Sequence, residues 1–252
     1  LNVDPCALHT RRLRRLLIDL QDEIKDAELA PYKEVDGSGL LRYVVARAAH
    51  LTNEIILTFV VTQADKVPFR RMVNRLKMRG HKISACYLNI NQSTGNEIFG
   101  ETLIHVSGQK SLRERLCELD FHVGPRSFFQ INPWMAEKMY RRSQQLVGPA
   151  SRQATAVDLY CGVGQIAMML ADRGYRVLGI EENAEAIEYA KQNASSNHYG
   201  ESTKFFAGRV EDHARLPIPE WGRTPDVVVV NPSRRGLAPE ARALIRSLLA
   251  QD

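Results

Sequence analysis

The sequence predicts a doubly wound α/β domain with a parallel sheet over residues 121–252, preceded by a smaller α+β domain over residues 1–120. Three observations support this. Strand and helix patterns alternate from residue 155 onward, as they do in parallel α/β sheets. A glycine-rich turn joins the first of these strands to a helix. The run of valines at 227–230 is typical of a strand buried on both faces.

The first domain is expected to open with an amphipathic helix, because apolar residues recur there at helical spacing. Its strands could form one mixed sheet, and a polar, turn-rich segment at 91–96 joins the last two. The boundary falls near 112–124, where we expect Cys117 at an apolar helical position. The expected elements are a helix at 9–29, strands at 40–46 and 54–62, a helix at 68–79, and strands at 83–90 and 97–106.

Asn132 and Pro133 predict the start of a helix that runs to Leu146, since asparagine caps helices well and proline suits the first turn. Asn183 is a plausible cap for a later helix. We expect the last strands of the sheet beyond residue 252. The elements expected before that point are strands at 155–159, 176–180, 204–206 and 226–230, and helices at 165–171, 184–194 and 239–249.

The most informative segment is the turn at 158–164. Gly162 and Gly164 let the backbone turn sharply and let a ligand approach it closely. The next strand ends at Glu181, whose carboxylate can accept two hydrogen bonds from a ribose diol. The segment therefore predicts a Rossmann-like site for a cofactor that contains a nucleoside.

Two classes of cofactor fit this turn. Gly162, Gly164 and Ala167 satisfy the relaxed dinucleotide pattern, so a nicotinamide cofactor is one interpretation. The other is S-adenosylmethionine, which has no pyrophosphate. Asp158 favours this second cofactor, because a buried carboxylate beside a pyrophosphate would be repulsive. A third interpretation is that the glycines serve packing only.

A second polar turn follows the valine strand at 231–236. Ligands of open α/β sheets bind at the carboxyl ends of strands, so Asn231 is expected near the mouth of the cofactor site. Asn-Pro also begins ordinary turns, and alone it would carry little weight.

Together these segments resemble the RNA 5-methyluridine methyltransferases, which act on uracil carbon 5 in ribosomal or transfer RNA. The resemblance covers nearly the whole chain and is most like the bacterial 23S ribosomal RNA branch. One departure is Ser233, where the family commonly has a second proline. The matching blocks are 127–130 with 132–133, 158–164, 179–181 and 231–236, supported by 39–43 and 91–101.

The resemblance implies roles for individual residues. Glu181 would hold the ribose hydroxyls, and Asp158 would bind the amino-acid end of the cofactor. Arg234 and Arg235 would contact RNA beside the active site. The other implied cofactor-binding residues are Gln130, Tyr160, Gly162, Gly164 and Asn231, and a contact with adenine is implied for one of Arg209, Glu211 and Asp212.

The chemistry implied by the family needs a cysteine and a general base. A thiolate adds to carbon 6 of uracil, carbon 5 takes the methyl group, and a base removes the carbon 5 proton so that the thiol can leave. In the family this cysteine follows the strand after the last expected helix, and the base lies further on, so we expect no catalytic residue within the chain and a natural protein longer at both ends. Cys86, Cys117 and Cys161 are expected to be buried, inert thiols.

Cys6 precedes the first helix, as the fourth ligand of an iron–sulfur cluster does in ribosomal RNA members of the family. The other three ligands have no counterpart here. The resemblance therefore implies an orphaned ligand at Cys6 and a cluster possible only in a longer protein. An inert surface thiol is the alternative.

Composition is that of an ordinary globular protein, with 44% hydrophobic residues and a net charge of +5 over 252 residues. Four cysteines without regular spacing indicate a reducing compartment, and we expect a cytoplasmic monomer. No apolar run reaches the ~20 residues that a membrane-spanning helix needs. Two basic clusters, at 11–15 and 70–79, could hold phosphates or simply form solvated helix faces.

The sequence thus favours an S-adenosylmethionine-dependent RNA uracil-5-methyltransferase whose partner is RNA, with ribosomal RNA preferred over transfer RNA. A non-catalytic RNA-binding relative is an alternative. A nicotinamide oxidoreductase is less favoured, because the Asn231 turn does not resemble a hydride-transfer site.

Overall fold

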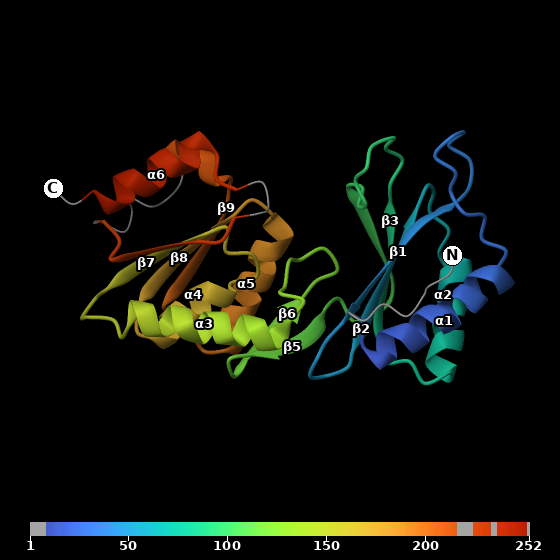
Figure 1. Ribbon diagram of the computed structural model, residues 1–252, viewed down its shortest axis with the longest axis horizontal. Coiled ribbons are helices and arrows are strands. Elements are labelled where there is room, and N and C mark those ends of the chain that lie inside the picture. The colour runs from blue at the N-terminus through green and yellow to red at the C-terminus, as the bar shows by residue number, and fades with distance from the viewer. Residues whose placement is uncertain (1–8, 216–223, 233–235, 251–252) are drawn as a thin grey trace. The chain divides into compact units, whose positions relative to one another are not determined.

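The computed structural model describes residues 9–215, 224–232 and 236–250 (Figure 1). The chain divides into two compact units, Leu1–Arg113 and Glu114–Asp252. This division lies within the range 112–124 where the boundary is expected from the sequence, and Glu114 is seven residues before 121, the expected first residue of the second domain. Among the helices of the described ranges, none is long and apolar enough to cross a membrane.

The first unit contains one mixed sheet of four strands, as the sequence suggested. The order is β1-β2-β3-β4, in which the β2–β3 pair is parallel and the two outer pairs are antiparallel. Helix α2 (Lys66–Met78) forms the crossover between the parallel strands. The strands are β1 (Leu41–Ala48), β2 (Ile55–Val61), β3 (Ile83–Ile90) and β4 (Thr102–Gly108).

Strand β4 begins five residues later than the sequence predicted, because two buried asparagines hold the preceding backbone in a turn. Asn91 Nδ2 donates to the carbonyls of Glu97 (2.7 Å) and Ile98 (3.1 Å). Asn89 Oδ1 accepts from the amide of Gly100 at 2.7 Å. These bonds satisfy backbone groups that would otherwise have extended the strand.

Helices α1 (Arg11–Asp26) and α2 pack on one face of this sheet. Alternate residues of the strands, such as Leu57 and Phe59 of β2, meet Leu16 and Phe69 of the helices in a single core. Side chains alternate between the two faces of each strand and repeat every 3.6 residues around each helix. The apolar residues at these spacings therefore meet in one layer between the sheet and the helices.

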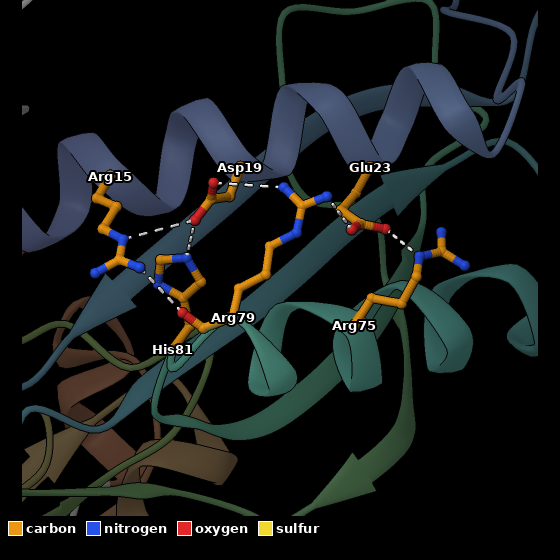
Figure 2. Close-up of polar contacts among 6 residues, drawn as sticks. All are labelled: Arg15, Asp19, Glu23, Arg75, Arg79 and His81. Atoms are coloured by element: carbon orange, nitrogen blue, oxygen red, sulfur yellow. Dashed lines mark hydrogen bonds and ion pairs between the residues drawn. The ribbon is translucent and has the colours of Figure 1, made fainter.

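A group of polar contacts, here termed the polar seam, joins α1 to the C-terminal end of α2 and the residues just after it (Figure 2). The Glu23 side chain is only 1% exposed, and it pairs with Arg75 and with Arg79, the latter at 3.0 Å. Asp19 contacts Arg79 at 3.4 Å and the His81 ring at 2.5 Å. Part of both basic clusters is thus occupied in holding α1 against α2.

The second unit contains the predicted parallel sheet, with the order β10-β7-β8-β9. The chain moves outward from β7 to β9 and then returns to pair β10 on the other side of β7. The topological switch point therefore lies between β7 and β10, which is where ligands of such sheets bind. The strands are β7 (Thr155–Leu159), β8 (Arg176–Glu181), β9 (Thr203–Ala207) and β10 (Val227–Val230).

Helices cover both faces of this sheet. On one face, α6 (Pro239–Leu249) packs Leu244 against Leu159 and Ile180. On the other, α4 (Gln165–Asp172) packs Ala167 and Leu170 against the alternate strand residues. The remaining elements are α3 (Pro133–Val147), α5 (Ala184–Ser196) and a short 3₁₀ segment, η1 (Val210–Arg215).

The helical position predicted for Cys117 is wrong. Strand β5 (Leu112–Leu116) and β6 (Leu119–Val123) form a hairpin, and Cys117 and Glu118 make its turn with φ of 50° and 68°. Along β5, residues are buried and exposed in strict alternation, which is a strand period rather than a helical one. On α5, Asn193 accepts from the His122 amide and Asn197 from the Asp120 amide, so the helix holds the hairpin.

We predict that Glu23→Ala destabilises the first unit by about 1–3 kcal/mol, since it leaves two arginines without their buried partner. Both tryptophans of the sequence fall in the second unit, so urea unfolding followed by circular dichroism should shift while the tryptophan fluorescence transition stays in place. Asp22→Ala, at an exposed position one residue away, serves as the control and should change the free energy by less than about 0.5 kcal/mol. Equal effects of the two substitutions would show that the seam does not stabilise the unit.

Candidate cofactor site

Asp158 lies near the carboxyl end of β7 and is fully buried. Neither of its carboxylate oxygens has a hydrogen-bond partner of normal geometry among the described residues. Burial raises the pKa of Asp158 to about 8; the Ala167 amide opposes this shift, and the negative Glu181 adds to it. A buried polar group without a partner is costly, so this carboxyl suggests a position where a ligand supplies the missing bonds.

The glycines of the turn after β7 serve two different needs. Both have positive φ, 55° at Gly162 and 84° at Gly164, which disfavours other residues. A Cβ at Gly164 would lie 3.1 Å from the Phe205 ring, so that glycine permits close packing. A Cβ at Gly162 would meet no described atom within 4 Å, so that glycine borders open space. The packing-only interpretation therefore fits Gly164 but not Gly162.

Glu181 ends β8 beside this turn. Its Oε2 accepts from the amide of Gly162 at 3.1 Å, and its Oε1 accepts from the amide of Asn183 at 3.0 Å. A carboxylate oxygen has more than one lone pair, so each can accept a further bond. The half-buried Glu181 is thus fixed by backbone amides and can still receive the hydroxyls of a ribose, as the sequence implied.

Tyr140 connects Gln130 with Asp158, a link that sequence reasoning missed. Burial raises the pKa of Tyr140 to about 12, the charge of Asp158 adds to the shift, and a hydrogen bond with Gln130 opposes it. Tyr140 is thus hydrogen-bonded with Gln130 and influenced by the charge of Asp158, which lies 28 positions further along the chain than Gln130. The available signal was that the helical period places Tyr140 in the core, where a tyrosine hydroxyl needs partners.

Tyr160 follows β7 with a φ of 64°, unusual for a residue with a side chain. Its hydroxyl donates to Glu211 Oε1 at 3.0 Å, and Arg209 lies 3.8 Å from the same carboxylate. Of the three residues considered for an adenine contact, Glu211 is therefore the one tied to the turn, and Asp212 is exposed. Burial raises the pKa of Tyr160 to about 12, and Glu211 reinforces the shift.

Asn231 follows β10, and its backbone amide donates to the carbonyl of Leu159 at 3.3 Å. This bond places the Asn231 backbone next to the end of β7, as expected for the switch point. Arg234 and Arg235 lie outside the described residues, and so does Cys6. No group of three or more metal-binding side chains occurs in the part of the chain that the structure describes.

The three described cysteines differ in their surroundings but share a raised pKa. Burial in the core of the first unit raises the pKa of Cys86 to about 12. Burial also raises the pKa of Cys117 in the hairpin turn, and it raises that of Cys161 well above its ordinary value. None of these thiols is suited to ionise near neutral pH.

Comparison with known proteins finds methyltransferases both among protein families and among individual relatives. Residues 150–233 match a family described as a methyltransferase domain. An RNA methyltransferase of Clostridium acetobutylicum is 32% identical over 94% of this chain and 51% of its own length. One from Listeria monocytogenes is 35% identical over 86% of this chain and 46% of its own length. The chain thus spans about half the length of the curated relatives it matches.

Among solved structures, the tRNA (uracil-54, C5)-methyltransferase of Pyrococcus abyssi, in complex with S-adenosyl-L-homocysteine, superposes with a TM-score of 0.75. It is 25% identical to this chain, and the match covers 98% of this chain and 57% of that one. The likeness therefore extends over both units.

We predict that stability depends on pH through Asp158. A carboxyl whose pKa is raised on folding binds more protons in the folded state between its unfolded value, about 4, and about 8. The free energy of unfolding should therefore fall as pH rises through this window, by up to roughly 1.4 kcal/mol per pH unit. Asp158→Asn should remove this dependence.

Urea unfolding of the wild type and of Asp158→Asn, compared between about pH 5 and about pH 8, measures the effect. The exposed Asp212→Asn is the matched control and should follow the wild type. Parallel profiles for Asp158→Asn and the wild type would contradict the raised pKa.

Proposed function

We propose that this chain takes part in S-adenosylmethionine-dependent methylation of uracil carbon 5 in RNA, because of its similarity to the bacterial RNA methyltransferases, to the methyltransferase domain and to the solved uracil C5 enzyme. The methyltransferase domain and the parallel sheet are those of the S-adenosylmethionine-dependent fold. The proposal rests mainly on three neighbouring features of the turn after β7. The buried Asp158 carboxyl has no hydrogen-bond partner among the described residues, Gly162 borders open space, and Glu181 is held by the Gly162 amide.

The residues at the turn fit S-adenosylmethionine. Asp158 would take its amino-acid end, Glu181 would accept from its ribose hydroxyls, and the open side of Gly162 would admit it to the backbone. When bound, S-adenosylmethionine supplies an electrophilic methyl group. A pyrophosphate near Asp158 would further oppose ionisation of a carboxyl whose pKa is already raised, whereas the ammonium group of S-adenosylmethionine would favour it, and this supports the sulfonium cofactor over a nicotinamide.

Gln130, Tyr160 and Asn231 complete the proposed site. Gln130 forms a hydrogen bond with Tyr140, and the backbone amide of Asn231 donates to the carbonyl of Leu159. Both residues are therefore held in place by hydrogen bonds. In this proposal Gln130 contacts the cofactor, and Asn231 faces the cofactor or the target base. Arg234 and Arg235 remain proposed RNA contacts.

Uracil carbon 5 is the proposed target because the Pyrococcus abyssi enzyme that superposes with a TM-score of 0.75 is a uracil C5 enzyme. That relative acts on transfer RNA, which supports transfer RNA as the alternative substrate. We keep ribosomal RNA as the proposed substrate, on the sequence resemblance around Cys6 and Phe128–Gln130. An iron–sulfur cluster at Cys6 remains a proposal for a longer protein.

The carbon 5 reaction needs a thiolate that reaches carbon 6 of the base, and a base that removes the carbon 5 proton. Cys86 lies in a core, and Cys161 is buried under the turn with a raised pKa. Cys117 lies in a hairpin turn with a raised pKa. We therefore place the nucleophile at none of these three positions.

We predict that the chain binds S-adenosylmethionine and not NADH, and that Glu181→Ala weakens this binding roughly 10- to 100-fold, because hydrogen bonds to a charged group are lost. Titration calorimetry measures both ligands. Glu182→Ala, at the next, exposed position, is the control and should bind like the wild type. Binding of NADH alone would overturn the proposed function.

We also predict that no described cysteine forms an adduct with RNA containing 5-fluorouridine. With S-adenosylmethionine present, an attacking thiolate would add to carbon 6 and carbon 5 would take the methyl group. Because fluorine then replaces the carbon 5 proton that a base must remove, the thiol could not leave and would stay attached to carbon 6. Mass spectrometry of the digested protein should find Cys86, Cys117 and Cys161 unmodified. An adduct at one of them, lost when that cysteine is changed to serine, would identify it as the nucleophile against our assignment.

A further inference from the structure

Several large apolar side chains are exposed immediately after Gln130. Ile131 is 96% exposed, Trp134 63% and Met135 60%, at the start of α3. Single exposed apolar residues are common, but neighbouring ones of this size usually mark a binding surface. This group begins one residue after a residue of the proposed cofactor site.

Cations are interleaved with these side chains on the solvent side of α3. Trp134 and Lys138 are four residues apart, and Met135 and Arg142 are seven apart, so each pair shares a side of the helix. The only acidic residue of α3 is Glu137, which pairs with Arg141 at 2.7 Å. Lys138 and Arg142 form no ion pair with a carboxylate among the described residues.

We propose that Ile131, Trp134, Met135, Lys138 and Arg142, here termed the α3 platform, bind single-stranded RNA of the substrate. Bases stack on the Trp134 ring, and Lys138 and Arg142 hold the phosphates that flank them. This combination of an aromatic surface and cations is the arrangement by which proteins bind single strands without reading sequence. The inference rests on the proposed function, since it names how that site holds its RNA.

The charge pattern favours RNA over a protein partner or a further apolar segment. Lysine is depleted at the centre of protein interfaces, whereas here Lys138 lies one helical turn from Trp134. The α3 platform is also close in the sequence to Gln130 of the proposed cofactor site. Trp134 is four positions after Gln130 in the sequence, which limits the distance between their Cα atoms to about 14 Å. RNA whose target base enters the cofactor site would therefore have neighbouring nucleotides near this ring.

The basic clusters of the first unit are weaker candidates. Arg75 and Arg79 are paired with Glu23, and Arg70 donates to the carbonyl of Val106. Arg15 donates to the carbonyl of Arg79. These guanidinium groups are already engaged within the unit, and no exposed aromatic ring lies between them in the helices concerned.

The test is a fluorescence-anisotropy titration of labelled oligouridine RNA of about 12 nucleotides, a length that spans a typical single-strand site. Trp134→Ala should weaken binding about 5- to 100-fold, the cost of one lost base stack. Lys138→Glu with Arg142→Glu should weaken binding and reduce the slope of log affinity against log salt by about 1.4, for two phosphate contacts. Leu249→Ala and Lys204→Glu, at exposed positions of the same unit, should change neither quantity.

Calorimetry with S-adenosylmethionine on the same variants separates the two proposals. Retained cofactor binding with weakened RNA binding supports the platform. Retained cofactor binding with unchanged RNA affinity and salt slope overturns the platform and leaves the proposed function standing. If the wild type binds S-adenosylmethionine but no oligouridine at low salt, the platform is overturned as well. Failure of the wild type to bind the cofactor contradicts the proposed function itself.

Discussion

Burial of the Asp158 carboxyl organises the electrostatics of the second unit. The ionised Asp158 carboxylate raises the pKa of Tyr140 and of Cys161, and the charge of Glu181 raises the pKa of Asp158. A lone carboxyl in such a place is tolerated only because apolar packing on both faces of the sheet is extensive. Glu181 influences Asp158 electrostatically and also fixes the turn at Gly162, so this carboxyl, which lacks a hydrogen-bond partner among the described residues, could be satisfied by a cationic or hydrogen-bond-donating ligand.

Elements that depend on local patterns were predictable from the sequence. Asn132 and Asn183 cap their helices through bonds to amides two or three residues on, which is a property of a few consecutive residues. The valine strand, the glycine turn and its acidic residues likewise follow from short segments. For this reason the amino-acid sequence alone predicts the parallel sheet and the grouping of Asp158, Gly162 and Glu181.

Other features depend on contacts between distant residues. The late start of β4 depends on the bonds of Asn89 and Asn91 to the backbone of residues 97, 98 and 100, which lie 6 to 11 positions away in the sequence. The role of Tyr140 appears only when Gln130 and Asp158 are brought to it. The hairpin around Cys117 belongs with these features, because β5 buries Glu114 between Leu112 and Leu116, and the apolar residues alone are spaced four apart as in a helix. Propensity is a weak guide wherever such long-range bonds decide.

The two asparagines on α5 have a consequence for how this molecule behaves among its own copies. Asn193 and Asn197 each bond both the amide and the carbonyl of one residue of β6, His122 and Asp120 respectively. A two-stranded hairpin otherwise presents a row of open backbone groups to any passing chain. Here the side-chain amides of the two asparagines form hydrogen bonds with the backbone N–H and C=O groups of β6, as the backbone of a neighbouring strand would. The hairpin therefore offers no template for intermolecular strand pairing at these positions, and the protein is protected there against aggregation.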